Sequence, residues 1–248
     1  MKLSKEQINF YKKFGMLKVE NFMGKNEVKF FKNEISRLAK SKNTKIAKYY
    51  QENLFGTKND LFRIEHFYEF SKKFRMLIDS KRVKNVINKL AGKKSILFKE
   101  KINIKPAYSR EDRLHQDVQG DWLKYSNNFI TFLVSLVKTD QKNGNLIFDE
   151  SGNNKNKIRG GMFKVLKVKE LKNPKFRSLP LNLGDVVFFN GYIPHKSTRN
   201  STKKSRIQIY ITYCVPKFKN TRNKYFTEKF QNCPPNASKK ISKFTFKN

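Results

Sequence analysis

The most constraining pattern in the chain lies at residues 205–215, where polar and apolar side chains alternate without interruption. One face carries Arg206, Gln208, Tyr210, Thr212 and Cys214, and the other carries Ile207, Ile209, Ile211, Tyr213 and Val215. Side chains two residues apart on a strand point to the same side of a sheet, so the segment is predicted to be a strand. Its apolar face must pack on a core, whereas its polar face either meets water or lines a cavity.

A second strand, predicted at residues 129–137, is apolar at nearly every position. Its only polar side chains, Thr131 and Ser135, lie on the face of Leu133 and Val137. A strand that is buried on both sides, with two hydroxyls on one of them, is typical of a barrel stave whose inner face meets a polar cavity. Shorter strands are predicted at residues 16–19, 145–148, 162–168 and 185–189, and a loop at 191–200.

Helices dominate the predictions for the first part of the chain. Ser4 and Gln7 form a capping box that predicts a helix from there to about Phe14, and apolar residues at helical spacing predict further helices near 25–40 and 80–90. From residue 96 the period changes to two, which indicates strands. We therefore expect one domain, built of a mainly helical support (1–95), a β-rich catalytic core (96–215) and a basic C-terminal extension (216–248).

Composition agrees with a packed, cytoplasmic domain. The chain has 248 residues, 38% of them hydrophobic, and its 23 Phe supply ample core material. No apolar run approaches the roughly 20 residues that span a bilayer, so membrane insertion is not expected. The net charge of +35 would attract anions, including nucleic acid. Lysine greatly outnumbers arginine, however, which favours a compositional origin over phosphate recognition.

Two potential metal ligands, His115 and Asp117, stand two residues apart and could converge on one point of a strand. With His195 they supply two imidazoles and one carboxylate, the set with open positions that non-haem Fe(II) oxygenases use. Arg206 lies a short loop beyond His195 and offers a planar, permanently charged fork for a carboxylate. The remaining histidine, His66, has only a neighbouring glutamate and is predicted to be structural.

Together with Gly184-Asp185, Pro194-His195 and Ser197, these residues resemble the phytanoyl-CoA dioxygenase (PhyH-like) family of Fe(II)/2-oxoglutarate-dependent oxygenases. The resemblance covers most of the chain. It implies a β-rich α+β fold, a double-stranded β-helix (cupin-like jelly roll) with packed N-terminal helices. It also implies a hydroxylase that uses Fe(II), O2 and 2-oxoglutarate as cosubstrate, and releases succinate and CO2.

The resemblance also assigns roles to particular residues. It implies that the iron is bound by His115, Asp117 and His195. The residues that it implies for the cosubstrate are Arg206, Ser197, Asn103, Thr131 and Leu133. Trp122 lies where relatives often contact substrate, and Lys101 and Lys105 share one face of a predicted strand, where they could attract a small anionic substrate or could be solvated.

Two details refine the expected chemistry. Relatives commonly carry a Pro-Gly-Ser-His segment where this chain has Asp149-Glu150-Ser151-Gly152-Asn153, so an unusual substrate pocket is expected. Related halogenases lack the carboxylate that Asp117 provides, so hydroxylation is expected here.

Three other functions are compatible with the same residues. One is the same chemistry on nucleic acid, suggested by the positive charge. Another is a non-enzymatic metal-binding jelly-roll module, which would have no reason to place Arg206 on the inner face. A third is a hydrolytic zinc site, which is chemically allowed but leaves Ser197 and Arg206 unexplained.

Overall fold

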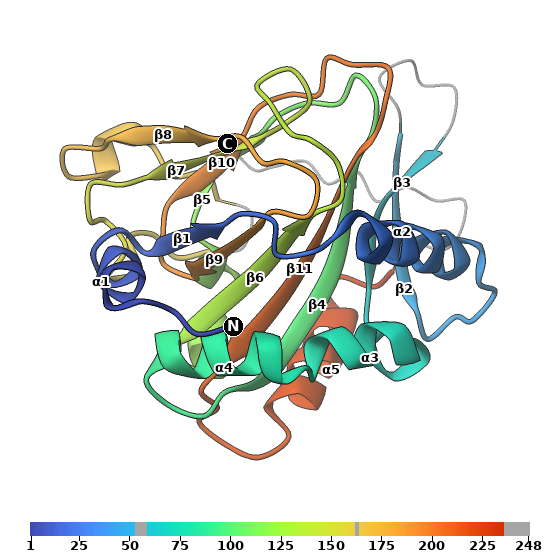
Figure 1. The fold of residues 1–248 in the computed structure, drawn as a ribbon, viewed down its shortest axis with the longest axis horizontal. Helices are drawn as coiled ribbons and strands as arrows, with labels where there is room; N and C mark the ends of the chain where they lie inside the picture. Colours follow the sequence, from blue (N-terminus) through green and yellow to red (C-terminus); the bar gives the residue numbers. More distant parts are fainter. Residues whose placement is uncertain (53–58, 162–163, 236–248) are drawn as a thin grey trace.

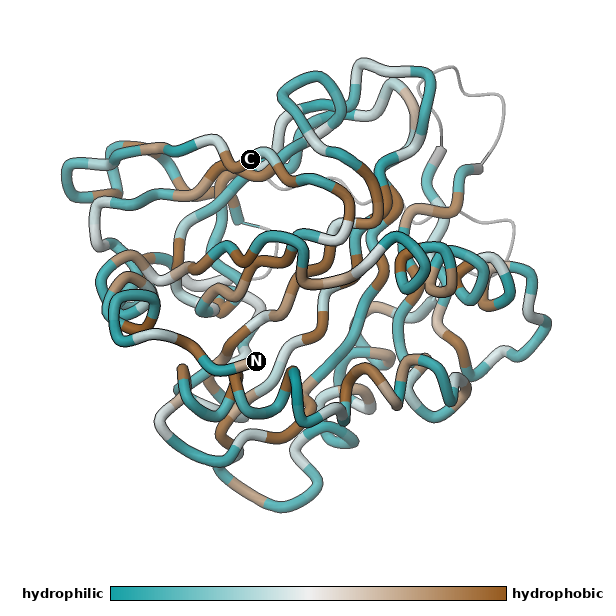
Figure 2. Tube along the Cα trace, viewed as in Figure 1, coloured by the Kyte–Doolittle hydropathy of each residue, from teal (hydrophilic) through white to brown (hydrophobic). Residues whose placement is uncertain are grey.

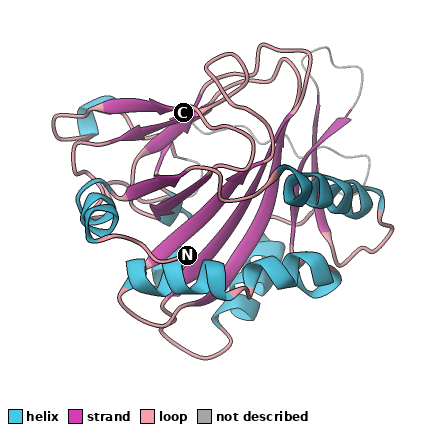
Figure 3. Cartoon of the chain, viewed as in Figure 1, coloured by secondary structure: helices cyan, strands magenta, loops and turns pink. Residues whose placement is uncertain are grey.

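The computed structural model describes residues 1–52, 59–161 and 164–235. Within them, the strands form two antiparallel sheets that face each other as a jelly roll (Figures 1 and 3). The larger sheet has seven strands in the order β1-β9-β6-β11-β4-β3-β2, and the smaller has four in the order β5-β10-β7-β8. The strands are β1 (Met16–Val19), β2 (Ala47–Glu52), β3 (Asn59–Glu65), β4 (Ile96–Lys105), β5 (Asp112–His115), β6 (Phe129–Ser135), β7 (Leu146–Asp149), β8 (Phe176–Leu179), β9 (Val186–Asn190), β10 (His195–Ser197) and β11 (Arg206–Cys214).

Most helices cover the outer face of the larger sheet. The α-helices are α1 (Lys5–Phe14), α2 (Lys25–Lys40), α3 (Lys72–Ile78), α4 (Lys81–Ala91) and α5 (Thr221–Asn232). Short 3-10 turns occur at Tyr68–Phe70, Asp117–Gly120, Trp122–Lys124 and Val168–Glu170. Figure 1 shows α2, α3 and α4 in front of the larger sheet and α5 behind it. None of the described helices has the length and apolar character needed to cross a membrane.

The capping box predicted at the start of α1 is confirmed. The backbone N–H of Gln7 donates to the Ser4 hydroxyl at 3.2 Å, and the Gln7 amide oxygen accepts from the Ser4 N–H at 3.0 Å. Gly15 ends the helix at a φ of 77°, and its N–H bonds to the carbonyl of Tyr11.

Strand β11 lies in the middle of the larger sheet, between β4 and β6. Its apolar face packs against the helices in the main core, which includes Ile209, Ile211 and Tyr213. Its polar face turns inward, toward the smaller sheet, and every residue of that face is buried. The predicted alternation is therefore confirmed, and the polar face lines the interior of the jelly roll rather than meeting water. Figure 2 shows hydrophobic residues concentrated along these central strands.

Three elements differ from the sequence-based predictions. The predicted loop at 191–200 contains strand β10, which is only three residues long but pairs with β5 on one side and β7 on the other. The strand predicted at 162–168 is absent from the described residues. Residues 162–163 lie outside the described part, and Leu166 buries its side chain against Leu114 and Leu171 without strand pairing.

The third difference is at the two ends of the chain. Residues 1–95 contribute the predicted strand β1, which joins one edge of the larger sheet, and also the β2–β3 hairpin, which was not predicted and joins the other edge. Helix α5 lies in the C-terminal extension, where no helix was predicted, and residues 236–248 of that extension lie outside the described part. Aromatic residues of α5, Tyr225 and Phe226, pack into a cluster with Phe98 and Trp122.

Candidate metal centre and inner groove

Three potential metal ligands converge between the two sheets. His115 ends β5, Asp117 begins the following 3-10 turn, and His195 begins β10. One ligand atom of each lies within 4.8 Å of the others, close enough to hold a single ion. His115 and His195 face each other in the strand register. Asp117 reaches the site from the turn that follows β5, whereas the sequence analysis placed His115 and Asp117 together on one strand.

Backbone carbonyls fix the orientation of both imidazoles. Nδ1 of His115 lies 2.7 Å from the carbonyl oxygen of Arg113, and Nδ1 of His195 lies 3.0 Å from that of Ile193. A proton on Nδ1 satisfies each carbonyl and leaves Nε2 as the metal-binding atom. The two rings therefore present the nitrogen that a metal needs.

The charge states of these groups also suit a metal. Burial lowers the pKa of His195 to about 4, with a further contribution from His115, so its imidazole is neutral at neutral pH. Burial alone would raise the pKa of Asp117, but Lys101 and the two imidazoles outweigh it and hold this pKa below its ordinary value. Two imidazoles and one carboxylate are the ligand set of non-haem Fe(II) enzymes.

We use the word groove for the strip of polar side chains on the inner faces of β4, β6 and β11, and its Arg206 end lies beside the triad. Arg206 is 2% exposed and lies level with Lys105, while Gln208 lies level with Asn103 on β4. Arg206 donates through Nη1 to the Gln208 amide oxygen. Within the described part of the chain, Arg206 Nε, Gln208 Nε2 and Asn103 Oδ1 are buried without a hydrogen-bond partner. Such atoms are rare in native interiors, so they indicate a polar ligand at this place.

Ser197 and Lys105 meet next to Arg206. The Lys105 ammonium donates to Asp112 Oδ2 at 3.0 Å and to the Ser197 hydroxyl at 2.8 Å, and this hydroxyl donates to the same Asp112 oxygen at 2.5 Å. The Asp112 side chain is 56% exposed, and Lys105, Ser197 and Arg206 hold its pKa below its ordinary value, so Asp112 is charged. The structure thus groups Lys105, predicted to contact substrate, with Ser197, predicted to contact cosubstrate. Sequence reasoning missed Asp112, the first residue of β5, because the charged residues around it show no distinctive pattern.

Other predicted residues occupy the same inner face. Thr131 Oγ1 lies 3.0 Å from Thr212 Oγ1, so the two hydroxyls share a hydrogen bond across β6 and β11. Leu133 is fully buried in the apolar cluster between the sheets. Trp122 is 4% exposed, and the Lys99 ammonium lies 4.5 Å from the centre of its ring.

His66 lies apart from the triad, as predicted. Its Nδ1 is 3.1 Å from the carbonyl oxygen of Lys45, and its ring centre is 4.5 Å from that of Phe226. It contributes to packing between the β2–β3 hairpin and α5.

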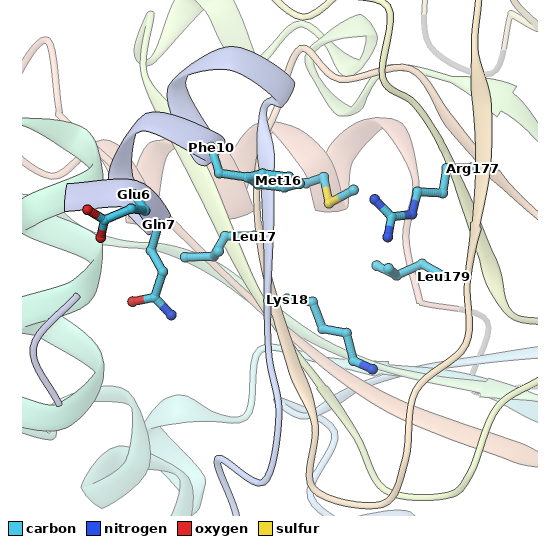
Figure 4. Close-up of a pocket in the computed structure, with 8 residues that line it drawn as sticks. All are labelled: Glu6, Gln7, Phe10, Met16, Leu17, Lys18, Arg177 and Leu179. Carbon is cyan, nitrogen blue, oxygen red and sulfur yellow. The ribbon is translucent and has the colours of Figure 1, made fainter. Parts of the chain in front are cut away.

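A separate pocket of about 360 Å³ lies between α1, β1 and β8, where the edges of the two sheets meet (Figure 4). It is lined by Glu6, Gln7, Phe10, Met16, Leu17, Lys18, Arg177 and Leu179. None of these residues belongs to the triad or to the Arg206 end of the groove.

Comparison with known proteins identifies the family. The model of the phytanoyl-CoA dioxygenase family matches residues 11–208, most of the chain. The chain belongs to this family. It is accordingly a non-haem iron, 2-oxoglutarate-dependent dioxygenase, with Fe(II), 2-oxoglutarate and O2 as its cofactor and cosubstrates.

Curated relatives agree with this membership, and a solved structure shares the fold. A 2-aminoethylphosphonate dioxygenase from the uncultured bacterium HF130_AEPn_1 is 29% identical over 196 residues, which cover 77% of this chain and 73% of the relative. A methylphosphonate hydroxylase from Gimesia maris is 23% identical over 229 residues, which cover 92% of this chain and 86% of the relative. The structure of EctD from S. alaskensis with 2-oxoglutarate and 5-hydroxyectoine has a TM-score of 0.72 at 19% identity, over 86% of this chain and 76% of that one.

Proposed function

We propose that this dioxygenase hydroxylates a small anionic metabolite, with iron held by His115, Asp117 and His195 and 2-oxoglutarate held by Arg206. One observation carries the proposal: the three ligand atoms lie within 4.8 Å of one another, beside a buried guanidinium whose Nε has no partner among the described residues. When bound, iron with 2-oxoglutarate and O2 supplies the oxidising chemistry that converts a C–H bond to C–OH and releases succinate and CO2.

The chain's own residues would orient the reactants. The carbonyls behind His115 and His195 fix the rings, so the metal position is set by the backbone. Arg206 would pair with a carboxylate of 2-oxoglutarate, and the amides of Asn103 and Gln208 would complete its polar contacts. Next to this guanidinium, Lys105, Asp112 and Ser197 are hydrogen-bonded to one another, so the Lys105 ammonium is already paired with the Asp112 carboxylate.

Aromatic side chains would keep water away from the reacting carbon. Phe98, Trp122, Tyr125 and Phe129 pack as one buried cluster beside the turn that carries Asp117. This apolar cluster limits the access of water and so strengthens electrostatic interactions in the groove.

An anionic substrate is supported by two lysines on the inner face of β4. Lys99 is 7% exposed and Lys101 lies close enough to Asp117 to lower its pKa. Two relatives carry phosphonates in their names, 2-aminoethylphosphonate and methylphosphonate. Small phosphonates are therefore the first substrates to test.

The decisive experiment is an anaerobic titration of the protein with Fe(II) and 2-oxoglutarate, followed by visible absorption and then by succinate release after oxygen is admitted. We expect wild type to show the charge-transfer band of iron with bound 2-oxoglutarate, and Asp117→Ala to lose both the band and succinate formation. Glu111→Ala removes an exposed carboxylate just before β5 and should behave as wild type. Iron-loaded wild type that binds no 2-oxoglutarate would refute the proposal.

A further inference from the structure

A second charged cluster lies at the other end of the groove. Glu65 on β3 lies opposite Lys101 on β4, and Arg63 lies opposite Asn103, so their side chains share the inner face of the larger sheet. Helix α5, which lies behind this sheet in Figure 1, adds Lys229 and Tyr225. We call this set the β3–β4–α5 cluster: Arg63, Glu65, Lys99, Lys101, Tyr225 and Lys229.

The cluster is well separated from Arg206. Strand β4 pairs with β11 so that Lys105 lies level with Arg206 and Lys99 lies level with Thr212. At about 3.3 Å per residue, the Cα atoms of Lys99 and Lys105 are roughly 20 Å apart. Lys101 lies between these ends and is the cation that acts most strongly on Asp117. A molecule seated on the cluster would therefore lie beside the iron ligands without displacing 2-oxoglutarate from Arg206.

Positive charge in the cluster is not balanced by its own side chains. Glu65 is fully buried; it accepts a hydrogen bond from Lys229 and lies 3.6 Å from Arg63. It is the single carboxylate among four cationic side chains, since the geometry assigns Asp117 to the metal. Burial drives the pKa of Lys99 well below its ordinary value, and the nearby Lys101 and Lys229 lower it further. A bound anion would favour the charged form of Lys99 and would balance the other cations of the cluster.

Hydrogen bonds in the cluster are also incomplete. Lys101 contacts the ring of Tyr210 at 4.8 Å, and it donates no hydrogen bond to any residue that the structure describes. Over the same described ranges, Arg63 Nε and Glu65 Oε1 are both buried without a hydrogen-bond partner. An ammonium and a guanidinium with free donors on one face indicate an oxygen-rich ligand.

Helix α5 is held firmly in this position. Arg222 pairs with Glu100 at 2.5 Å and with Glu69 at 3.3 Å, and Glu228 accepts a hydrogen bond from Tyr125 at 2.7 Å. The Tyr225 hydroxyl accepts a hydrogen bond from Lys99 at 3.3 Å. These contacts hold α5 against one end of the groove. The helix lies beyond residue 208, where the family match ends.

We propose that the β3–β4–α5 cluster binds a dianionic phosphoryl head group of the substrate, either a phosphonate or a phosphate monoester, and that α5 supplies part of the substrate specificity. This inference rests on the proposed function and names the substrate class for the same site. A dianion compensates more of the excess positive charge than a carboxylate can, and its three terminal oxygens can accept from Lys99, Lys101 and Arg63 together.

Calorimetry on the iron-loaded protein, with 2-oxoglutarate and without oxygen, tests this choice. The probes are 2-aminoethylphosphonate, phosphoethanolamine and β-alanine, which share an ammonium on a two-carbon chain and differ in the acidic group. We expect at least one phosphoryl probe to bind at least tenfold more tightly than β-alanine, and the tighter of the two distinguishes phosphonate from phosphate ester. Equal affinity for all three, or no binding of either phosphoryl probe, overturns the inference.

Variants separate the cluster from general charge effects. Lys101→Met should abolish the preference for a phosphoryl head group while leaving 2-oxoglutarate affinity within about threefold of wild type. Lys89→Met removes an exposed lysine of α4 and should keep the preference. Tyr225→Phe deletes only the hydroxyl that contacts Lys99 and should weaken the phosphoryl probe severalfold, which provides a second test if Lys101→Met does not fold.

Failure of the inference is distinguishable from failure of the proposed function. Loss of 2-oxoglutarate binding by the wild type would refute the proposed function, and the head-group preference can then be measured on the metal-free protein. Intact 2-oxoglutarate binding with no head-group preference, or with a preference that survives Lys101→Met, would refute the inference alone.

Discussion

Replacement of Arg206 by Met should weaken 2-oxoglutarate binding far more than it weakens folding. The guanidinium is 2% exposed, and within the described residues its Nε has no partner, so a carboxylate bound there would be desolvated and charge-paired. Truncating one member of a buried, hydrogen-bonded charge pair costs about 2–5 kcal/mol. At about 1.4 kcal/mol per factor of ten, this corresponds to a roughly 30- to several-thousand-fold loss of affinity.

The assay is the anaerobic Fe(II) and 2-oxoglutarate titration, with iron binding and thermal unfolding measured on the same variants. Arg206→Lys keeps the charge but loses the planar fork, so its affinity should fall between those of wild type and Arg206→Met. Arg199→Met, at an exposed position of the loop after β10, is the matched control and should bind 2-oxoglutarate normally. If Arg206→Met binds 2-oxoglutarate within threefold of wild type while still binding iron, the assignment of Arg206 is wrong.

Two further predictions concern stability. In urea unfolding, Gly184→Ala should lower the stability of the protein by about 3 kcal/mol and Gly92→Ala by about 1 kcal/mol. Both glycines have a positive φ, but a Cβ at Gly184 would lie 2.1 Å from the Met23 carbonyl oxygen, whereas a Cβ at Gly92 would meet nothing within 4 Å. Equal losses for the two variants would contradict this reasoning. Burial raises the pKa of Glu65, but Lys229 and neighbouring cations outweigh it and lower that pKa to about 2. The stability that this pair provides is complete above about pH 4.5 and is lost as the pH falls toward 2, so wild type should lose more unfolding free energy between pH 6 and pH 3 than Glu65→Gln, and parallel curves would exclude the pair as the cause.

Much of the fold could be predicted because its strongest signals are local. The alternation in β11, the apolar run of β6 and the cap of α1 each follow from side-chain periodicity or from a hydrogen bond within four residues. Strand β10 could not be predicted in this way, because a three-residue strand is defined by its two neighbours rather than by its own sequence. Helix α5 was missed for a related reason. Its buried residues are few, and its position depends on ion pairs to residues far away in the chain.

The residues of the site likewise fall into those with a local sequence signal and those that meet only in the folded structure. His115 and Asp117 are close in sequence and have a recognisable spacing, and His195 and Arg206 follow on adjoining elements. Asp112 carries no such signal, because its role depends on Lys105 and Ser197 reaching it from two other strands. Arg63, Glu65 and Lys229 could not be connected either. They come from a hairpin and a terminal helix that meet only in three dimensions.

Burial offers a way to separate functional charge from compositional charge in a chain with a net charge of +35. An exposed lysine costs almost nothing to keep, so a biased composition can fill the surface with lysines without any effect on folding. A buried cation is expensive unless it has a partner, so composition alone would not retain it. Lys99 and Lys105 are each 7% exposed and Arg206 is 2% exposed, and all three face the same groove. The surface charge therefore says little about function, whereas the proposed small anionic substrate would give these interior cations the counter-ion that their burial requires.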